Sequence, residues 1–205
     1  MKKILSIIFS SAFLMTSAYA GGMIGIKGGF GELDGTRTED SKFGKQSASV
    51  DHEYGAIFAE IELANNISVG VEYIPMQAII DTKSSSNVDS HAIIENHTTI
   101  YALKRFGDTF YAKAGFSQAD AEVKANYTTT TINDHDDTVD GPMVGIGAQL
   151  ESPIPFLDVV RLEATYTKYN EMEITTTNTT GTADKDTKKG EAEQLTFTIG
   201  IAKSF

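Results

Sequence analysis

Residues of the types that catalysis needs are few in this chain of 205 residues. A hydrolase requires a nucleophile, a base and an orienting acid within reach of one another. The local group that comes nearest to this requirement combines His97 with Thr98 or Thr99 and with Glu95. The other histidines lie in long connections between predicted strands, and they are His52, His91 and His135. We therefore expect no enzyme activity, and we assign no catalytic residue.

The run NDHDD at residues 133–137 is the candidate metal site, because it places carboxylate oxygens close to an imidazole. Calcium takes several oxygen ligands at short spacing, but an EF-hand adds a fixed glycine and a regular ligand pattern that this run lacks. We interpret the run as a solvated acidic loop. The alternative is a loop that divalent ions bridge to anionic lipopolysaccharide. No metal and no other cofactor is expected.

The first twenty residues have the composition of a secretory signal peptide. Lys2 and Lys3 precede an apolar run that ends near Met15, and Ala18-Tyr19-Ala20 supplies an A-x-A cleavage site. The apolar run is too short for a membrane-spanning helix. We expect a signal peptide at residues 1–20 and a single exported domain at residues 21–205.

Charge and cysteine content exclude two further classes. The formal net charge is −11, and a balance this acidic argues against nucleic acid as a partner. The chain contains no cysteine, so neither disulfides nor thiolate chemistry are available to it.

Eight stretches alternate between apolar and small or polar residues with the period of a β-strand. They are 22–33, 54–64, 67–75, 98–106, 109–117, 143–151, 159–167 and 194–205. Short connections at 64–66, 107–108 and 152–158 alternate with long ones at 34–52, 77–96, 118–140 and 170–192. Short turns at one end and long loops at the other are typical of an up-and-down barrel in a membrane.

Alternation alone does not say which face is outside, because a soluble lipocalin-like barrel alternates with its apolar face inward. The non-apolar face carries small residues and ions of nearly balanced charge. A lysine or arginine that faces lipid at mid-membrane costs about 2–4 kcal/mol, so several would exceed a typical stability of about 5–15 kcal/mol. We therefore predict a lumenal charge network of Lys27, Glu60, Glu62, Glu72, Lys104, Lys113, Arg161 and Glu163. In the stretch 98–106 this assignment directs Tyr101 and Leu103 to lipid, and Lys104 inward.

The strand stretches YAKAGF, VGIGAQLE and RLEATYT, with the terminal Phe205, resemble the small outer-membrane barrels of the OmpA/OmpX and opacity type. The resemblance implies an all-β, eight-stranded antiparallel barrel in the cell outer membrane, with short periplasmic turns and long extracellular loops. It also implies an assembly signal, read by the outer-membrane assembly machinery, at Phe197, Ile199, Ile201 and Phe205. Lys203 departs from that signal. Without tryptophan, the aromatic girdles are expected to use Tyr73, Tyr101, Tyr166, Phe110 and Phe205.

An eight-stranded barrel has an interior just wide enough for its own side chains. We therefore expect a monomer with a structural and surface-interaction role, and a narrow low-conductance porin is the alternative. In the OmpX-like branch, protruding strands are thought to offer sheet edges to other proteins, which implies adhesion through the long loops. The expected partners are outer-membrane lipid, lipopolysaccharide, the assembly machinery and surface proteins.

Overall fold

The computed structural model describes residues 21–38, 45–63, 65–75, 78–83, 88–127, 135–177 and 185–205. All regular elements within these ranges are strands, nine in number. They are β1 (Gly22–Thr38), β2 (Lys45–Glu62), β3 (Ile67–Ile74), β4 (Ala78–Lys83), β5 (Val88–Phe106), β6 (Phe110–Tyr127), β7 (His135–Glu151), β8 (Val159–Thr177) and β9 (Lys185–Ser204). The predicted signal peptide lies outside the described residues. No helix in the described part of the chain is long and apolar enough to cross a membrane.

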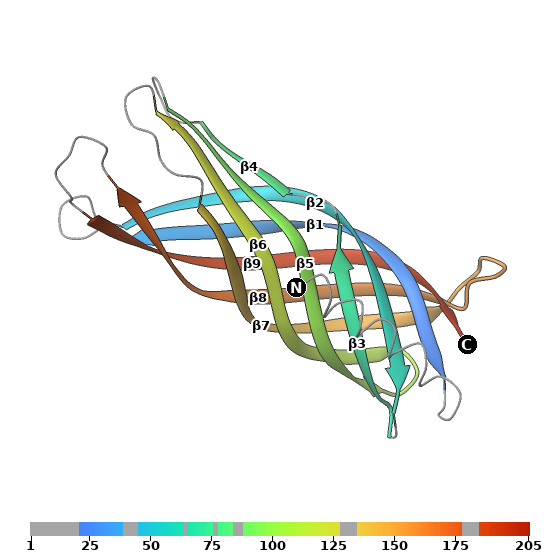
Figure 1. Cartoon of the computed structure of the whole chain (residues 1–205). Coiled ribbons are helices and arrows are strands. Elements are labelled where there is room, and N and C mark those ends of the chain that lie inside the picture. The colour runs from blue at the N-terminus through green and yellow to red at the C-terminus, as the bar shows by residue number, and fades with distance from the viewer. Residues whose placement is uncertain are drawn as a thin grey trace.

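The strands close into one antiparallel barrel (Figure 1). Strands that follow one another in sequence pair, except β3 and β4, which both pair with β5, and β1 pairs with β9 from Met23↔Ser204 to Thr38↔Lys189. β3 and β4 follow one another along β5, with Pro75 after the end of β3, so the nine segments form eight strands around the circumference. The predicted eight-stranded antiparallel barrel is confirmed, with its third strand in two segments.

Three short turns join strands at one end of the barrel, which we call the turn end. Asn65 and Asn66 adopt left-handed φ values of 61° and 60° between β2 and β3, and Gly107 has a φ of 68° between β5 and β6. Asparagine and glycine tolerate this conformation, which tight hairpins require. The connection between β7 and β8 is the longest of the three, at residues 152–158.

The strands at the opposite end, the ribbon end, are longer than the sequence pattern predicts. The predicted loops 34–52, 77–96, 118–140 and 170–192 are largely strand, because β1, β2 and β5–β9 each contain 17 to 20 residues. Beyond the apolar belt both faces of a strand can meet water, so hydrogen-bonded pairing continues without the period-two alternation that revealed the rest.

The barrel separates into two sheets at the ribbon end. The ladder between β7 and β8 ends at Met143↔Thr167, and the ladder between β2 and β3 ends at Ile57↔Tyr73. Beyond these pairs, β8, β9, β1 and β2 form one four-stranded sheet, while β4, β5, β6 and β7 form the other. Figure 1 shows β4, β5 and β6 diverging from β1, β2 and β9 in this region.

The apolar side chains face outward. Ile24, Leu162 and Ile199 are exposed on the outer surface, Ile199 by 58 %, whereas Glu60 and Lys113 are buried inside, Lys113 with 4 % exposed. This arrangement is the reverse of a soluble lipocalin-like barrel and excludes that alternative. The other outward apolar residues that are exposed include Ile26, Phe30, Val69, Ile100, Phe110, Phe116, Val144, Ile146, Leu195 and Phe197.

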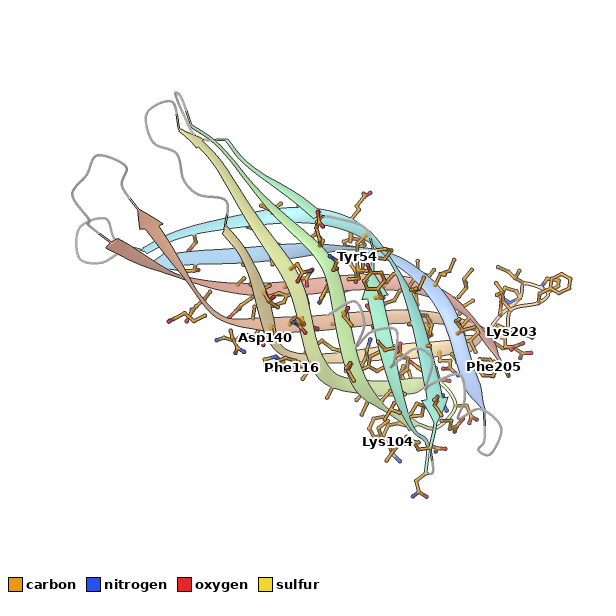
Figure 2. All side chains as sticks on the ribbon, in the orientation of Figure 1. Tyr54, Lys104, Phe116, Asp140, Lys203 and Phe205 are labelled. Carbon is orange, nitrogen blue, oxygen red and sulfur yellow. The ribbon has the colours of Figure 1, made fainter. Side chains whose placement is uncertain are left out.

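β5 corrects one prediction. Tyr101 and Leu103 are buried inside the barrel, whereas Lys104 is exposed on its outer side (Figure 2). The reason lies in the short turn that follows, where Phe106 pairs with Phe110. Residues paired across two strands share a face, so the outward Phe110 directs Phe106 outward, and Lys104, two residues earlier, with it. Tyr101 is therefore not part of an aromatic girdle.

Candidate functional site

Four charged side chains form a closed ring inside the barrel. Lys27 comes from β1, Glu72 from β3, Lys113 from β6 and Glu163 from β8, so every second strand around the circumference contributes one residue. Lys27 Nζ lies 2.6 Å from Glu72 Oε2 and 2.7 Å from Glu163 Oε1. Lys113 Nζ lies 2.9 Å and 3.0 Å from the same two oxygens. Each cation thus contacts two anions, and the ring is neutral.

A second buried pair joins β8 to β2. Arg161 donates from Nη1 to Glu60 Oε1 at 2.5 Å and from Nη2 to Glu60 Oε2 at 2.7 Å, the bidentate geometry that suits a guanidinium and a carboxylate. Arg161 also donates to the side-chain oxygen of Gln149 on β7 at 3.1 Å. The hydroxyl of Tyr101 donates to Glu60 Oε1 at 2.8 Å. These bonds satisfy both charges away from water.

Two tyrosine rings contact the charged side chains of the ring and of the Arg161–Glu60 pair. Tyr111 donates its hydroxyl to Glu163 Oε2 at 3.1 Å, and the ammonium of Lys113 lies 3.9 Å from the centre of the Tyr101 ring. Glycines make room for these rings: a Cβ added at Gly147 would overlap Tyr111, and one added at Gly70 would lie 2.6 Å from Tyr101. Charge pairs, rings and glycines together fill the lumen at this level.

Two predicted members of the charge network, Glu62 and Lys104, belong to neither the ring nor the buried pair. Glu62, near the turn end, is partly exposed and lies 3.1 Å from Arg105 Nη1. Lys104 is exposed and donates from Nζ to the backbone carbonyl of Asn65. The sequence prediction missed Arg105, because it reversed the two faces of β5. The pairing of Phe106 with Phe110 across the three-residue turn 107–109 is the relationship that places Arg105 inside.

Polar contacts continue above the ring toward the ribbon end. Tyr169 donates its hydroxyl to Gln194 Oε1 at 2.8 Å, and the amide nitrogen of Gln194 lies 2.7 Å from His52 Nε2. His97 Nε2 lies 3.5 Å from the Tyr169 hydroxyl. A small apolar cluster follows, in which strands of both sheets meet. Its members are Leu33, Ala119, Val139, Tyr169 and Ala192.

The group around His97 does not have the contacts of a catalytic triad. The hydroxyl of Thr99 lies 2.8 Å from Ser117 Oγ, and that of Thr98 donates to the backbone carbonyl of Asn96. The nucleophile candidates are thus bonded elsewhere. The side chains of residues 133–137 lie outside those that the structure describes, and the described side chains hold no cluster of three metal-ligating residues.

Comparisons with known proteins place this geometry in a known fold. No family model matches the chain, and no curated protein matches it. The solved structure of OprG from Pseudomonas aeruginosa, an outer-membrane protein, has a TM-score of 0.55 and 12% identity over 91% of this chain and 96% of that one. Ail of Yersinia pestis, the attachment invasion locus protein, in complex with sucrose octasulfate, has a TM-score of 0.50 and 14% identity over 90% of this chain and 99% of that one. The chain has the fold of the small outer-membrane β-barrels.

An outer-membrane barrel of this kind has short periplasmic turns and longer extracellular loops. The turn end is accordingly periplasmic and the ribbon end extracellular. The outward apolar belt meets the hydrocarbon of the outer membrane, and the charge ring lies inside the wall. A closed barrel also leaves no unpaired strand edge in the hydrocarbon, which explains why β9 remains paired with β1 to its end.

The C-terminal strand completes the barrel at the periplasmic end. Phe205 and Gly22 exchange backbone hydrogen bonds of 2.7 Å and 2.9 Å. The predicted assembly-signal residues Phe197, Ile199, Ile201 and Phe205 occupy alternate positions on the outer face. Lys203 shares that face, next to Phe205 (Figure 2), and its Nζ lies 2.8 Å from Asp158 Oδ1. The backbone N–H of Ser204 donates to the other carboxylate oxygen at 2.7 Å.

Proposed function

We propose that this outer-membrane barrel is a non-enzymatic protein that binds other proteins at the cell surface through its extracellular strands. The length of those strands carries the proposal. β5, β8 and β9 contain 19, 19 and 20 residues, whereas about 9–11 residues of tilted strand cross a bilayer. Each strand therefore continues well beyond the hydrocarbon. A barrel that only sealed the membrane would not need this length.

Sheet edges at the extracellular end supply the binding mode. Among the described ladders, β2 pairs with β1 alone from Lys45 to Ala56, and β7 pairs with β6 alone from His135 to Pro142. The N–H and C=O groups along such an edge can pair with an extended segment of another protein. Main-chain hydrogen bonds then give affinity, while the side chains of the ribbon give specificity.

The charge of the outer face at the extracellular end determines which proteins can bind there. The outer face just above the apolar belt is acidic, with exposed Glu32, Asp34, Asp51, Glu53 and Glu191. Ail of Yersinia pestis was solved with a heparin analogue, but a polyanion would be repelled by this face. The chemistry favours a protein with a free strand edge and basic side chains beside it.

Conduction of ions through a narrow pore is the second candidate function. Paired and buried side chains fill the lumen at the level of the charge ring, which opposes the passage of ions. We expect the purified protein in planar bilayers to give no stable single-channel steps. Large and stable steps would favour the porin alternative over a closed barrel.

Lipid, lipopolysaccharide and the assembly machinery complete the proposed partners. The apolar belt would contact lipid and the acyl chains of lipopolysaccharide. The outward residues Phe197, Ile199, Ile201 and Phe205 are proposed as the signal that the assembly machinery reads. The protein is proposed to act as a monomer, because the barrel closes on its own strands.

Removal of residues 126–134 tests the binding proposal. A bacterium that displays this variant is expected to lose adherence to host or neighbouring cells, while the barrel still assembles. Assembly is checked by the change of gel mobility on heating, since closed barrels resist cold detergent. A control in which a Gly/Ser segment of equal length replaces the same residues should also lose adherence, because glycine and serine form strand edges poorly. Undiminished adherence of both variants would refute the proposal.

A further inference from the structure

The periplasmic turn between β7 and β8 is an ordered structure. Ser152 donates its backbone N–H to the carbonyl of Asp158 at 2.9 Å, and its hydroxyl oxygen accepts from the N–H of Ile154 at 3.1 Å. The N–H of Leu157 donates to the carbonyl of Ile154 at 3.2 Å. Pro153 and Pro155 further restrict the backbone. The backbone of the turn therefore sets the directions in which its side chains leave the chain.

This ordered turn presents apolar side chains outward. Phe156 is 89 % exposed and Ile154 is 48 % exposed. Phe156 has a φ of 80°, a left-handed conformation that an aromatic residue adopts at a cost in free energy. A turn that faced only water would gain nothing from holding a phenylalanine in this way. Its exposure points to an apolar partner.

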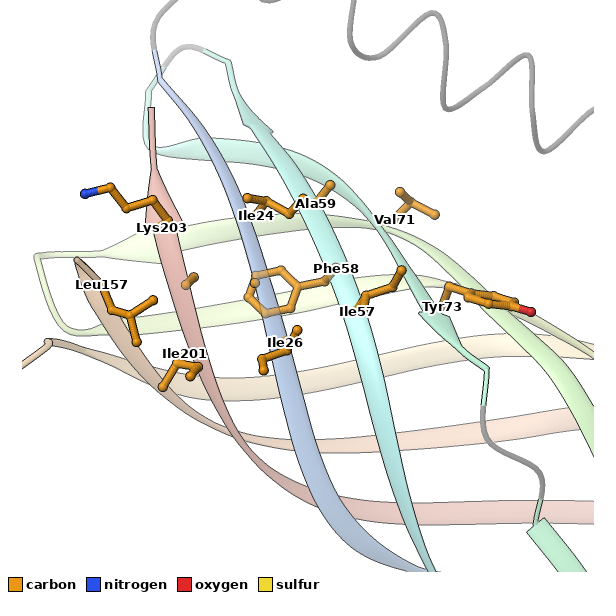
Figure 3. A pocket seen from close by; sticks show the side chains of 12 residues that line it. Ile24, Ile26, Ile57, Phe58, Ala59, Val71, Tyr73, Leu157, Ile201 and Lys203 are labelled. Atoms are coloured by element: carbon orange, nitrogen blue, oxygen red, sulfur yellow. The ribbon is translucent and has the colours of Figure 1, made fainter. Parts of the chain in front are cut away.

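The next residue connects the turn to the lipid-facing wall. Leu157 lies beside Ile201 at the margin of a groove of about 360 Å³ that also contains Ile24 and Ile26 (Figure 3). All of these side chains belong to the outward apolar surface. The groove is continuous with the belt that contacts hydrocarbon, so lipid chains reach it without leaving the membrane.

The surroundings of the turn match the boundary of a bilayer. Phe106, Phe110 and Phe205 are exposed at the same end of the barrel, and aromatic residues gather where hydrocarbon meets headgroups. Lys203 lines the groove; its side chain is about half exposed, and its ammonium contacts Asp158. Lysine at this depth can direct its charge to the headgroup region.

We propose that the 152–158 turn anchors the barrel in the periplasmic leaflet of the outer membrane. Phe156 and Ile154 insert among the phospholipids of that leaflet, and Leu157 covers an acyl chain that lies in the groove beside β9. The anchor fixes the depth of the periplasmic end, and it acts independently of any binding at the extracellular ribbons.

The absence of tryptophan from the chain allows a direct test. Phe156→Trp places a single fluorophore on the turn of the full-length protein, reconstituted in phosphatidylcholine vesicles with or without brominated acyl chains. Bromine quenches tryptophan only at close range. Phe110→Trp, on the outward belt, is the control for a lipid-facing site, and Asp34→Trp, exposed at the extracellular end, is the control for water.

The anchor predicts that brominated lipid quenches Phe156→Trp at least half as much as Phe110→Trp, and that aqueous acrylamide quenches it less than Asp34→Trp. Ile154→Trp should behave in the same way and serves if Phe156→Trp does not assemble. Quenching by lipid no greater than that of Asp34→Trp would overturn the proposal. It would mean that the turn points into the periplasm, as a site for a protein partner would.

Discussion

Arg161 on β8 and Glu60 on β2 form a bidentate ion pair inside the barrel, with N–O distances of 2.5 Å and 2.7 Å. Three strand-to-strand steps separate β8 from β2 around the wall, by way of β9 and β1. The pair therefore connects parts of the barrel that backbone hydrogen bonds join only indirectly. Both side chains are buried, so neither charge has water as an alternative partner.

Removal of one partner of this pair should be costly. Arg161→Met leaves the Glu60 carboxylate buried without its cation, and loss of one partner of a buried pair costs about 3–5 kcal/mol. The double variant Arg161→Met/Glu60→Leu removes both charges and should recover most of that loss. The measurement is urea unfolding in phospholipid vesicles. Equal losses for the single and double variants would contradict the argument.

The alternation of cations and anions around the ring can be tested by variants that keep two lysines and two glutamates but exchange their positions. Lys113→Glu/Glu163→Lys keeps two cations and two anions but places like charges side by side, so we expect a loss of about 3–5 kcal/mol or failure to assemble. The quadruple variant that also carries Lys27→Glu and Glu72→Lys restores alternation and should regain stability relative to the double variant. If the double variant is as stable as the wild type, the ring does not hold the wall together.

Replacement of a glycine by alanine should be tolerated where the glycine faces outward and should be destabilising where it faces the filled lumen. Gly147→Ala would push a Cβ into the ring of Tyr111, and overpacking of this kind costs typically about 1–3 kcal/mol. At Gly28, which faces outward, the nearest atom to an added Cβ is 3.8 Å away, so Gly28→Ala should be nearly neutral. Urea unfolding of the two matched variants checks the difference. A greater loss for Gly28→Ala would contradict the assignment of the faces.

Acid should release the carboxylate that holds the C-terminal strand. Asp158 lies in the exposed periplasmic turn, and the hydrogen bonds from Lys203 and from the Ser204 N–H hold its pKa below the ordinary value. A lowered pKa means that the carboxylate's contribution is present at neutral pH and is lost as the pH falls through that lowered pKa. The amide resonance of Ser204 should report this titration by NMR in micelles. Lys203→Ala should raise the midpoint, and an unchanged midpoint would exclude the bond to Lys203 as its cause.

The sequence was sufficient to predict the barrel because the bilayer imposes alternation on each spanning strand. Ile24, Leu162 and Ile199 face outward as predicted, since one residue of slip in a strand would bury its apolar set. β5 was assigned wrongly because Leu103 is apolar yet faces the lumen, where it packs with Tyr101 and Tyr111. Inside a filled barrel an apolar side chain is as acceptable as a polar one, so hydrophobicity does not determine the face there.

The sequence pattern predicted that the four members of the ring face the lumen, but it did not predict that they contact one another. Alternation placed Lys27, Glu72, Lys113 and Glu163 on inward faces, but their common level depends on the stagger of strands around the barrel. That stagger follows from the register of all eight strands together. The extended ribbons were missed because the backbone ladders continue beyond the apolar belt, where the sequence no longer alternates with a period of two.

The central claim is that successive residues of each spanning strand face, in turn, the lipid and the sealed interior of the barrel. The chain contains no cysteine, so single cysteines can be placed along β9 from Gln194 to Ile201 and carry nitroxide labels in vesicles. Relaxation by oxygen, which concentrates in hydrocarbon, should be high at Leu195, Phe197, Ile199 and Ile201. It should be low at Gln194, Thr196, Thr198 and Gly200. A reversed alternation, or labels at Phe197 and Ile199 that respond to a water-soluble nickel complex instead of oxygen, would contradict the account.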